Sequence, residues 1–390
     1  MATFDSNKPG SYCGYEYDKF LTSNVSVGPR GDYYHLVLIK NGKIIAFGDE
    51  QGNYAGGIYA STEFSQTRFM EEKENLREKY PELYDKIKDI PLAKPYKPAN
   101  KAIYQPKGKA GEYAGWACNF YTGCSNDCQY CYCKKGVLSH VWSTTPTLKK
   151  CFKDQDDALA VFKKEFDYYT SESDFRKRGL FFSFTTDPLL DETIGLTISA
   201  VEYALRHSIP VQVLTKRADG ALRLIESLSS RLGGINPYIH RIAVGFTLTG
   251  HDELEPNADL TDSRIHAMRQ IHALGLKTFA SIEPMLDLPT AEDVINCTLG
   301  FCDLYKIGLL SGGKRTIDSH DLAYFVPRIT EKIGNAGAKV YWKESISEET
   351  GGITAGWSGI VRTDRFTQVT ADYDIFGDTS RIGVKNRFSL

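Results

Sequence analysis

The sequence predicts an α/β fold in which a parallel sheet, backed by helices, curves into a partial barrel. From about Gly115 onward, short apolar runs alternate with longer amphipathic ones, which is the pattern of parallel strands joined by helices. This unit recurs about six times, fewer than the eight of a closed (β/α)8 barrel. Polar side chains recur where the apolar runs end, and ligands bind at that edge of a parallel sheet.

We expect the first strand at residues 117–121, directly before a loop rich in cysteine. The later strands are expected at 179–186, 211–216, 241–249, 277–283, 304–310 and 339–344. The helices between them are expected at 156–170, 191–207, 219–232, 261–274, 290–299 and 319–333. Together these elements predict a partial (β/α)6 TIM-like barrel over residues 111–345.

The flanking regions differ from this pattern. In the N-terminal accessory region, residues 1–110, the stretch 33–47 alternates like a hairpin with Asn41 and Gly42 at its turn, and 61–90 is charged with helical spacing. Residues 346–390 form a C-terminal extension that we expect to cap the barrel. We expect the first region to pack on the barrel or to form part of the substrate entrance, and the alternative is a cover for exposed core.

Composition narrows the classes of function. Lysine and arginine number 47 against 49 acidic residues, and the net charge of −2 argues against a sequence-independent nucleic-acid binder, although a local basic groove is compatible with it. No apolar run approaches the roughly 20 residues of a membrane span, and the N-terminus lacks a secretory pattern. We therefore expect a cytoplasmic protein without a membrane partner.

Three cysteines carry the strongest functional signal. Three residues separate Cys124 from Cys128 and two separate Cys128 from Cys131, in a short loop led by Gly123. Soft thiolates select iron and sulfur, and three of them leave one iron of a four-iron cluster open for chemistry. The alternative is a structural zinc site, for which Cys118 or Cys133 would be the fourth ligand.

Residues at the predicted strand ends are candidate ligands for a cofactor. Thr185, Thr186 and Asp187 follow the second strand, and Lys216 follows the third, where it could neutralise a carboxylate. Further candidates of the same kind are Thr247, Thr249 and Glu283 on the fourth and fifth strands. The alternative interpretations are a capping turn for the first group and a solvated side chain for the lysine.

The cysteine pattern resembles that of the radical S-adenosylmethionine (SAM) superfamily. The stretch 121–133, with Tyr130 inside it, the Thr-Thr-Asp-Pro turn at 185–188, Thr215 with Lys216, and Glu-Pro-Asn at 255–257 followed by Arg264 are similar to the spore photoproduct lyase-like branch. The similarity spans 117–310, about half the chain. It implies a [4Fe-4S] cluster on the three cysteines, and SAM held by Tyr130, Thr186, Lys216 and either Thr247 or Thr249.

One departure weakens the match to true spore photoproduct lyases. Their hydrogen-donating cysteine stands two residues before the Ser or Thr at the end of the second strand, where this chain has Phe184. The resemblance implies reductive cleavage of SAM to methionine and a 5′-deoxyadenosyl radical, with electrons from a donor such as flavodoxin or ferredoxin. The substrate stays open between a nucleobase or nucleic acid and a small metabolite or peptide. A zinc-stabilised binding module without catalysis is the remaining alternative. The catalytic residues beyond the cofactor site are not predicted.

Overall fold

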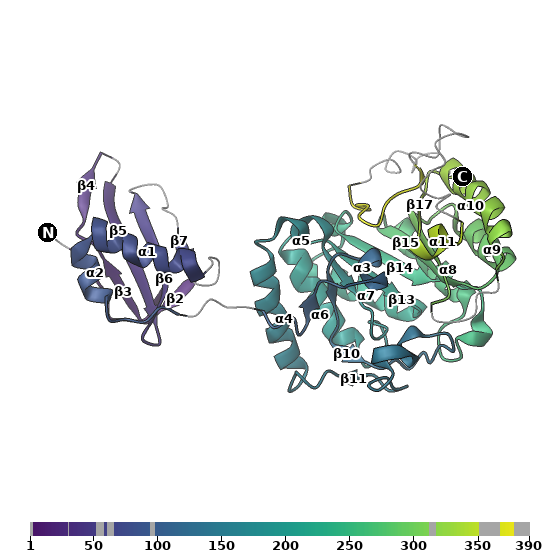
Figure 1. The fold of residues 1–390 in the computed structure, drawn as a ribbon, viewed down its shortest axis with the longest axis horizontal. Coiled ribbons are helices and arrows are strands. Elements are labelled where there is room, and N and C mark those ends of the chain that lie inside the picture. The colour runs from purple at the N-terminus through teal and green to yellow at the C-terminus, as the bar shows by residue number, and fades with distance from the viewer. Residues whose placement is uncertain are drawn as a thin grey trace. The chain divides into compact units, whose positions relative to one another are not determined.

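The computed structural model describes residues 3–29, 31–51, 58–60, 66–93, 98–311, 317–350 and 367–377 (Figure 1). Contacts between residues divide the chain into two compact units, 1–99 and 100–390. The C-terminal extension predicted at 346–390 lies partly outside the described residues, at 351–366 and 378–390. The boundaries predicted at 110 and 345 stay predictions. None of the helices within the described ranges is long and apolar enough to cross a membrane.

The first unit is an antiparallel sheet with two helices. Its longest strands, β5 (Gly31–Lys40) and β6 (Lys43–Gln51), form the predicted hairpin, and Asn41 and Gly42 at its turn have φ of 49° and 67°. Positive φ at both positions suits a tight hairpin turn, and asparagine and glycine adopt it readily. The other elements are β1 (Gly10–Tyr12), β2 (Tyr15–Tyr17), β3 (Lys19–Thr22), β4 (Ser26–Gly28), β7 (Ile58–Ala60), α1 (Gln66–Lys79) and α2 (Pro81–Ile87).

Both faces of this sheet are covered. Val37 and Ile39 of β5 pack with Phe69 of α1 and Leu83 of α2 on one face. On the other face, Leu36 and Leu38 pack with Phe20 and with tyrosines of the β1–β2 hairpin. Because successive strand residues point to opposite faces, the uninterrupted apolar run of β5 serves two cores at once.

The second unit is built on an eight-stranded sheet with the order β17-β16-β15-β14-β13-β12-β9-β8. Its strands are β8 (Ile103–Tyr104), β9 (Ala117–Cys118), β12 (Leu180–Phe182), β13 (Val211–Thr215), β14 (Ile242–Thr247), β15 (Lys277–Met285), β16 (Leu304–Leu309) and β17 (Lys339–Trp342). All neighbours are parallel except β8 with β9. From β9 to β17 the strands therefore follow one another in sequence order. In the part of the chain that the structure describes, β8 and β17 do not pair, so the barrel is not closed.

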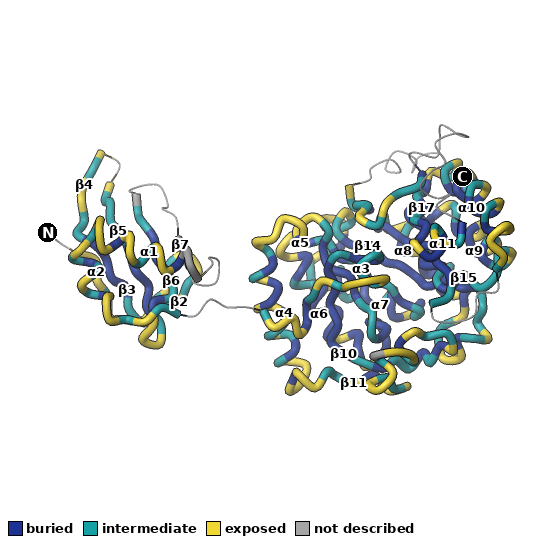
Figure 2. The backbone as a smooth tube through the Cα atoms, viewed as in Figure 1, coloured by how far each residue is buried: buried dark blue, intermediate teal, exposed yellow. Residues whose placement is uncertain are grey.

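Helices follow the strands and lie around the outside of the sheet (Figure 1). They are α4 (Gln155–Tyr169), α5 (Ser173–Arg178), α6 (Ile194–Arg206), α7 (Ala218–Leu232), α8 (Thr261–Ala273), α9 (Leu288–Thr298), α10 (Ser319–Asn335) and α11 (Glu344–Glu349). Consecutive helices from α6 to α10 pack against each other. Most of the large core lies between these helices and the sheet, where the tube is dark blue in Figure 2.

A smaller core lies on the opposite, inner face of the sheet. Phe181, Ala243, Phe279 and Leu304 belong to it, one each from β12, β14, β15 and β16. Period-two alternation places Thr247, two pairs along β14 from Ala243, on this inner face, and it does the same for residues 281 and 283 of β15 and 306 and 308 of β16. Thr247 and Glu283, both predicted as ligands at strand ends, thus share one face of the sheet.

The expected α/β alternation is confirmed, and two of the differences in detail affect the predicted site. The second parallel strand is shorter than predicted, ending at Phe182, so that Thr185 and Asp187 stand in a loop. The first predicted strand is divided: β9 joins the main sheet, whereas β10 (Tyr121–Thr122) pairs with β11 (Thr147–Leu148) in a separate two-stranded sheet. This second sheet holds the base of the cysteine loop.

Segments remote in sequence meet at the last strands of the sheet. The short helix α3 (Lys109–Tyr113) precedes β9, yet the Glu112 carboxylate accepts a hydrogen bond from the backbone N–H of Glu344, at 2.9 Å. The Tyr113 carbonyl accepts one from Lys306 Nζ of β16, at 3.1 Å. Near the C-terminus, Gln368 forms a bridge with Val340 of β17. The segment α3 therefore links the first parallel strand of the sheet to the last two.

Candidate active site

A cavity of about 450 Å³ opens at the carboxyl ends of the parallel strands. Its walls include seven of the eight predicted cofactor ligands and all three predicted cluster cysteines. These are Cys124, Cys128, Cys131, Tyr130, Thr185, Thr186, Asp187, Lys216, Thr247 and Glu283. Thr249 is the exception. The structure thus brings residues from five separate segments of the sequence to one cavity.

The cysteine loop is shaped by backbone turns. Gly123 has φ of 82° and Asp127 has φ of 50°, the left-handed region that glycine and short polar residues adopt most readily. The N–H of Cys124 donates to the carbonyl of Ser143, at 2.9 Å, and the N–H of Cys131 donates to the carbonyl of Cys128, at 3.2 Å. The loop therefore folds back on itself and is tied to the segment that leads into β11.

The cysteines differ in their surroundings. Burial raises the pKa of Cys124 to about 12 and also raises that of Cys128, whereas a hydrogen bond with Cys133 lowers the pKa of Cys131 to about 6. Cys133 lines the cavity, and Cys118 is fully buried in the core outside its walls. Of the two candidates for a fourth ligand, Cys133 is thus the one near the loop.

Within the described ranges, no three His, Cys, Asp or Glu side chains are close enough together to hold one metal ion. In a four-iron cluster each cysteine binds a different iron, so the thiolates stand farther apart than the ligands of a single zinc. Two further polar atoms of the cavity wall, Asn126 Oδ1 and Thr186 Oγ1, are buried without a hydrogen-bond partner. Two unpartnered polar atoms beside the three cysteines fit a cofactor with polar groups of its own.

The Asp187 carboxylate organises this part of the cavity. Its Oδ1 accepts from the N–H of Leu189 at 3.0 Å and from Thr215 Oγ1 at 2.7 Å. Its Oδ2 accepts from Asn126 Nδ2 and from the N–H of Lys216, both at 2.8 Å. A carboxylate with four such partners has most of its acceptor capacity filled. Asp187 therefore positions the cysteine loop and the end of β13, and has little capacity left for a ligand.

The neighbouring residues Thr185 and Thr186 differ in whether the hydroxyl already has a protein partner. Thr185 Oγ1 donates to the carbonyl of Tyr121, at 2.6 Å, and so fixes the loop to β10. Thr186 Oγ1 is buried and lacks a protein partner. A buried hydroxyl without a partner is costly, and a ligand would relieve that cost. Thr186 is thus the better candidate for a cofactor contact.

Lys216 and Tyr130 converge on one buried carboxylate. Glu255 accepts a hydrogen bond from the Tyr130 hydroxyl, pairs with the fully buried Arg264, and lies 4.0 Å from Lys216 Nζ. Burial alone would lower the pKa of Lys216, but its electrostatic interactions with Cys128 and Glu255 outweigh burial and raise it. The ammonium group thus stays charged at the cavity wall, as neutralising a carboxylate of a ligand requires.

The fourth strand presents Thr247 to the cavity, whereas Thr249, beyond the end of β14, is not part of the cavity wall. Thr249 Oγ1 donates to Glu255 Oε1, at 3.3 Å, and accepts from the N–H of His251. Thr247 lines the cavity, while its carbonyl accepts from Arg264 at 2.6 Å. Of the two alternatives at this strand, the geometry favours Thr247.

Glu283 pairs with a residue that directly follows another strand, β17. Its Oε1 and Oε2 accept hydrogen bonds from Lys343 Nζ at 2.7 Å and 2.9 Å, and both residues line the cavity. Neither this pair nor the positions of Asn126 and Trp142 in the cavity wall were predicted from the sequence. Asparagine in a loop and a single tryptophan carry no signal of their own. Only their placement beside the cysteines identifies them.

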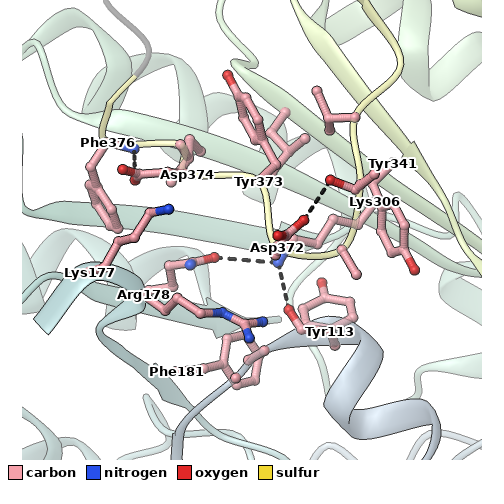
Figure 3. Close-up of a pocket in the computed structure, with 18 of the residues that line it drawn as sticks. Tyr113, Lys177, Arg178, Phe181, Lys306, Tyr341, Asp372, Tyr373, Asp374 and Phe376 are labelled. Carbon is pink, nitrogen blue, oxygen red and sulfur yellow. Dashed lines mark hydrogen bonds between the residues drawn. The ribbon is translucent and has the colours of Figure 1, made fainter. Parts of the chain in front are cut away.

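A second, much smaller cavity of about 30 Å³ lies at the amino ends of the strands, beneath residues 369–376 (Figure 3). Lys306 projects into it and donates to the Tyr113 carbonyl (Figure 3). Tyr113 and Phe181 line both cavities. These two side chains therefore separate the large cavity from the small one.

No model of a known protein family matches the chain, and no curated protein sequence matches it. Solved structures with a similar chain trace include Streptococcus suis SuiB bound to S-adenosylmethionine, with 11% identity and a TM-score of 0.38 over 62% of this chain and 53% of SuiB. SuiB without that ligand gives 11% identity and 0.39 over 62% and 52%. SuiB bound to its precursor peptide SuiA gives 12% and 0.35 over 57% and 47%. The matched region spans about half of SuiB, and the similarity is distant.

Proposed function

We propose that this chain is a radical SAM enzyme whose barrel is the partial (β/α)6 form of that superfamily. The observation that carries the proposal is the position of Cys124, Cys128 and Cys131 in the wall of one cavity. The same wall contains Thr186, with its unpartnered hydroxyl, and the charged Lys216. Parallel strands in sequence order support the proposed barrel.

The residues divide the work as follows. Cys124, Cys128 and Cys131 would hold a [4Fe-4S] cluster, with Asn126 and Asp187 fixing the loop that carries them. When bound, the cluster and SAM together supply one-electron cleavage of SAM to methionine and a 5′-deoxyadenosyl radical, which abstracts hydrogen from a substrate carbon.

SAM would lie along the strand ends next to the cysteine loop. Lys216 would neutralise its carboxylate, and Thr186 and Thr247 would bond its polar groups. Tyr130, held by Glu255, would form part of the wall that excludes water. An external carrier such as a flavodoxin or ferredoxin would deliver the electron.

For the substrate we propose a nucleobase or nucleotide. Aromatic side chains able to stack on a base, including Phe184 and Trp142, line the cavity, and Lys107 and Lys109 are exposed at it. Binding of oligonucleotides that weakens steeply with salt would support this substrate, and its absence would contradict it. A small metabolite or peptide is the second candidate, which the charged groups at the strand ends, Lys216 and Glu283 among them, favour.

The function is tested by 5′-deoxyadenosine formation. The protein is reconstituted anaerobically with iron and sulfide, and SAM and dithionite are added. We expect product with the wild type and none with Cys128→Ala. As the matched control, Cys151→Ala changes an exposed thiol outside the cavity and should leave the yield unchanged.

Two results would contradict the proposal. Product that persists in Cys128→Ala would refute the cluster assignment. Stoichiometric zinc without iron or sulfide after anaerobic purification would favour the binding-module alternative. The variant Cys133→Ala tests whether Cys133 is a fourth ligand. A cluster held by three cysteines predicts that this variant keeps its iron.

A further inference from the structure

We propose that the Glu283 side of the large cavity is a subsite for a cationic or N–H-rich group of the substrate, such as an amine or amidine. Glu283 lies on β15 and its partner Lys343 directly follows β17. In the order of the sheet these strands lie at the opposite end from β9, which precedes the cysteine loop. The inference rests on the proposed function only in assigning the cysteine side of the cavity to the cofactors.

The Glu283–Lys343 pair crosses an intervening strand. Strand β16 lies between β15 and β17, and its residue at the crossing point is Gly308. A Cβ atom on Gly308 would stand 2.8 Å from Lys343 Cδ and 3.3 Å from Glu283 Cδ. The missing side chain therefore makes room for the lysine to reach across the strand. The pair is a built feature of the inner face rather than a surface contact.

Two of the three N–H donors of Lys343 are engaged by Glu283. Both oxygens of Glu283 accept from its ammonium group, and Glu112 Oε2 lies 3.8 Å from Nζ on another side. The lysine side chain is only 5% exposed. An ammonium group enclosed by two carboxylates has little left to offer an anionic ligand.

Acceptor capacity remains at Glu283. Its side chain is 24% exposed, and a carboxylate has about four lone-pair sites, of which Lys343 takes two. Among the described residues of the cavity wall, the other carboxylate is Asp187, whose four protein partners fill it. Glu283 is therefore the carboxylate of this wall that can accept from a ligand.

The surroundings limit the shape of that ligand. The remaining wall is largely apolar, with Phe181, Phe184 and Leu310 among its residues, and Ser281 lies two positions before Glu283 on the same face of β15. A flat apolar body with a cationic end group fits such a wall. Of the other lysines in the cavity wall, Lys216 would bind the cofactor, and Lys107 and Lys109 are exposed to solvent.

The sign of the subsite can be measured with three probes of nearly equal shape: benzamidine, benzamide and benzoate. Binding to the full-length protein is followed by ligand-observed NMR and calorimetry, before and after anaerobic reconstitution with SAM. We expect benzamidine to bind at least about tenfold more tightly than benzoate, because hydrogen bonds to a charged acceptor are the stronger ones. Preference for benzoate would overturn the proposal.

The variant Glu283→Gln assigns the binding to this side chain. It should weaken benzamidine binding about tenfold or more and leave benzamide nearly unchanged. Glu226→Gln is the control, because Glu226 is an exposed residue of α7. Equal benzamidine affinity in Glu283→Gln and wild type would overturn the proposal. The wild-type preference among the three probes tests it even if Glu283→Gln does not fold.

This experiment also separates the inference from the proposed function. Probe binding needs no SAM cleavage, whereas the function is tested by 5′-deoxyadenosine. Product formation with a benzoate-preferring cavity would leave the function intact and refute the subsite. Benzamidine preference without any product would do the reverse.

Discussion

Asn126 of the cysteine loop donates a hydrogen bond from Nδ2 to Oδ2 of Asp187, 2.8 Å away, although 61 positions separate them in sequence. The same oxygen accepts from the N–H of Lys216 at the end of β13. One carboxylate thus sets the position of the cysteine loop relative to the predicted SAM-binding lysine. This contact joins the cysteine loop to the end of β13.

Replacing Asp187 with Asn should loosen the cysteine loop. An amide offers one acceptor oxygen and turns its NH2 group toward donors, so about two of the four hydrogen bonds would be lost. We expect the free energy of unfolding to fall by roughly 2–4 kcal/mol, with lower iron incorporation after reconstitution. Urea denaturation and iron analysis measure both effects.

Asp191→Asn is the control for this prediction. Asp191 is highly exposed and pairs with Arg223 on the surface, so its neutralisation should change stability by less than about 0.5 kcal/mol. Wild-type iron content and stability in Asp187→Asn would show that the carboxylate does not hold the loop.

We expect Glu165 to contribute strongly to the stability of the fold, although it is not one of the predicted cofactor residues. It is fully buried on α4, and its carboxylate accepts from the N–H groups of Lys101, Ala102 and Ile103 at 2.8–2.9 Å. Glu165→Gln leaves at least one of these buried donors unsatisfied. We expect a loss of about 2–3 kcal/mol in urea denaturation, against less than about 0.5 kcal/mol for the exposed Glu226→Gln. A loss of stability in Glu165→Gln no larger than that in Glu226→Gln would contradict this account.

Gly308→Ala tests the crossing of β16 by the Glu283–Lys343 pair. The new methyl group would stand 2.8 Å from Lys343 Cδ, so the lysine side chain must shift and its contact with Glu283 would be disturbed. Overpacking at such a site costs about 1–3 kcal/mol, measured as a shift of the urea midpoint. The matched control is Gly300→Ala, where a Cβ atom would meet nothing within 4 Å. Equal stability of the two variants would show that the pair does not need the glycine.

Lys306 predicts a pH dependence of stability. Burial, reinforced by the charge of Lys343, lowers its pKa from 10.5 to about 7. Between these values the unfolded state holds one more proton than the folded state, so stability should rise as pH rises through this window. From pH 7.5 to 9 we expect a gain of roughly 1–2 kcal/mol in the wild type that Lys306→Met lacks. Urea denaturation at both pH values measures this gain. Equal gains in the wild type and in Lys306→Met would contradict the lowered pKa of Lys306.

The sequence by itself determined the alternation of strands and helices and the candidate ligands. Apolar periodicity is local, so the strands from β12 to β17 could be placed to within a few residues. The spacing of Cys124, Cys128 and Cys131 is local in the same sense, because a short loop restricts where three thiols can point. The turn at Asn41 and Gly42 was predictable from the backbone angles that these residues adopt.

Only the tertiary structure decided which candidates remain available to a ligand. In the sequence, Thr185, Thr186 and Asp187 are equally good candidates for binding a ligand. In the structure, the Asp187 carboxylate already accepts four hydrogen bonds, Thr185 bonds Tyr121, and the Thr186 hydroxyl has no protein partner. Thr247 and Thr249 are distinguished in the same way, because Thr247 lines the cavity whereas Thr249 bonds Glu255. The links of Lys343 to Glu283 and of α3 to β16 also join residues far apart in the chain. Such contacts depend on how the sheet brings distant segments together, and local residue patterns do not encode them.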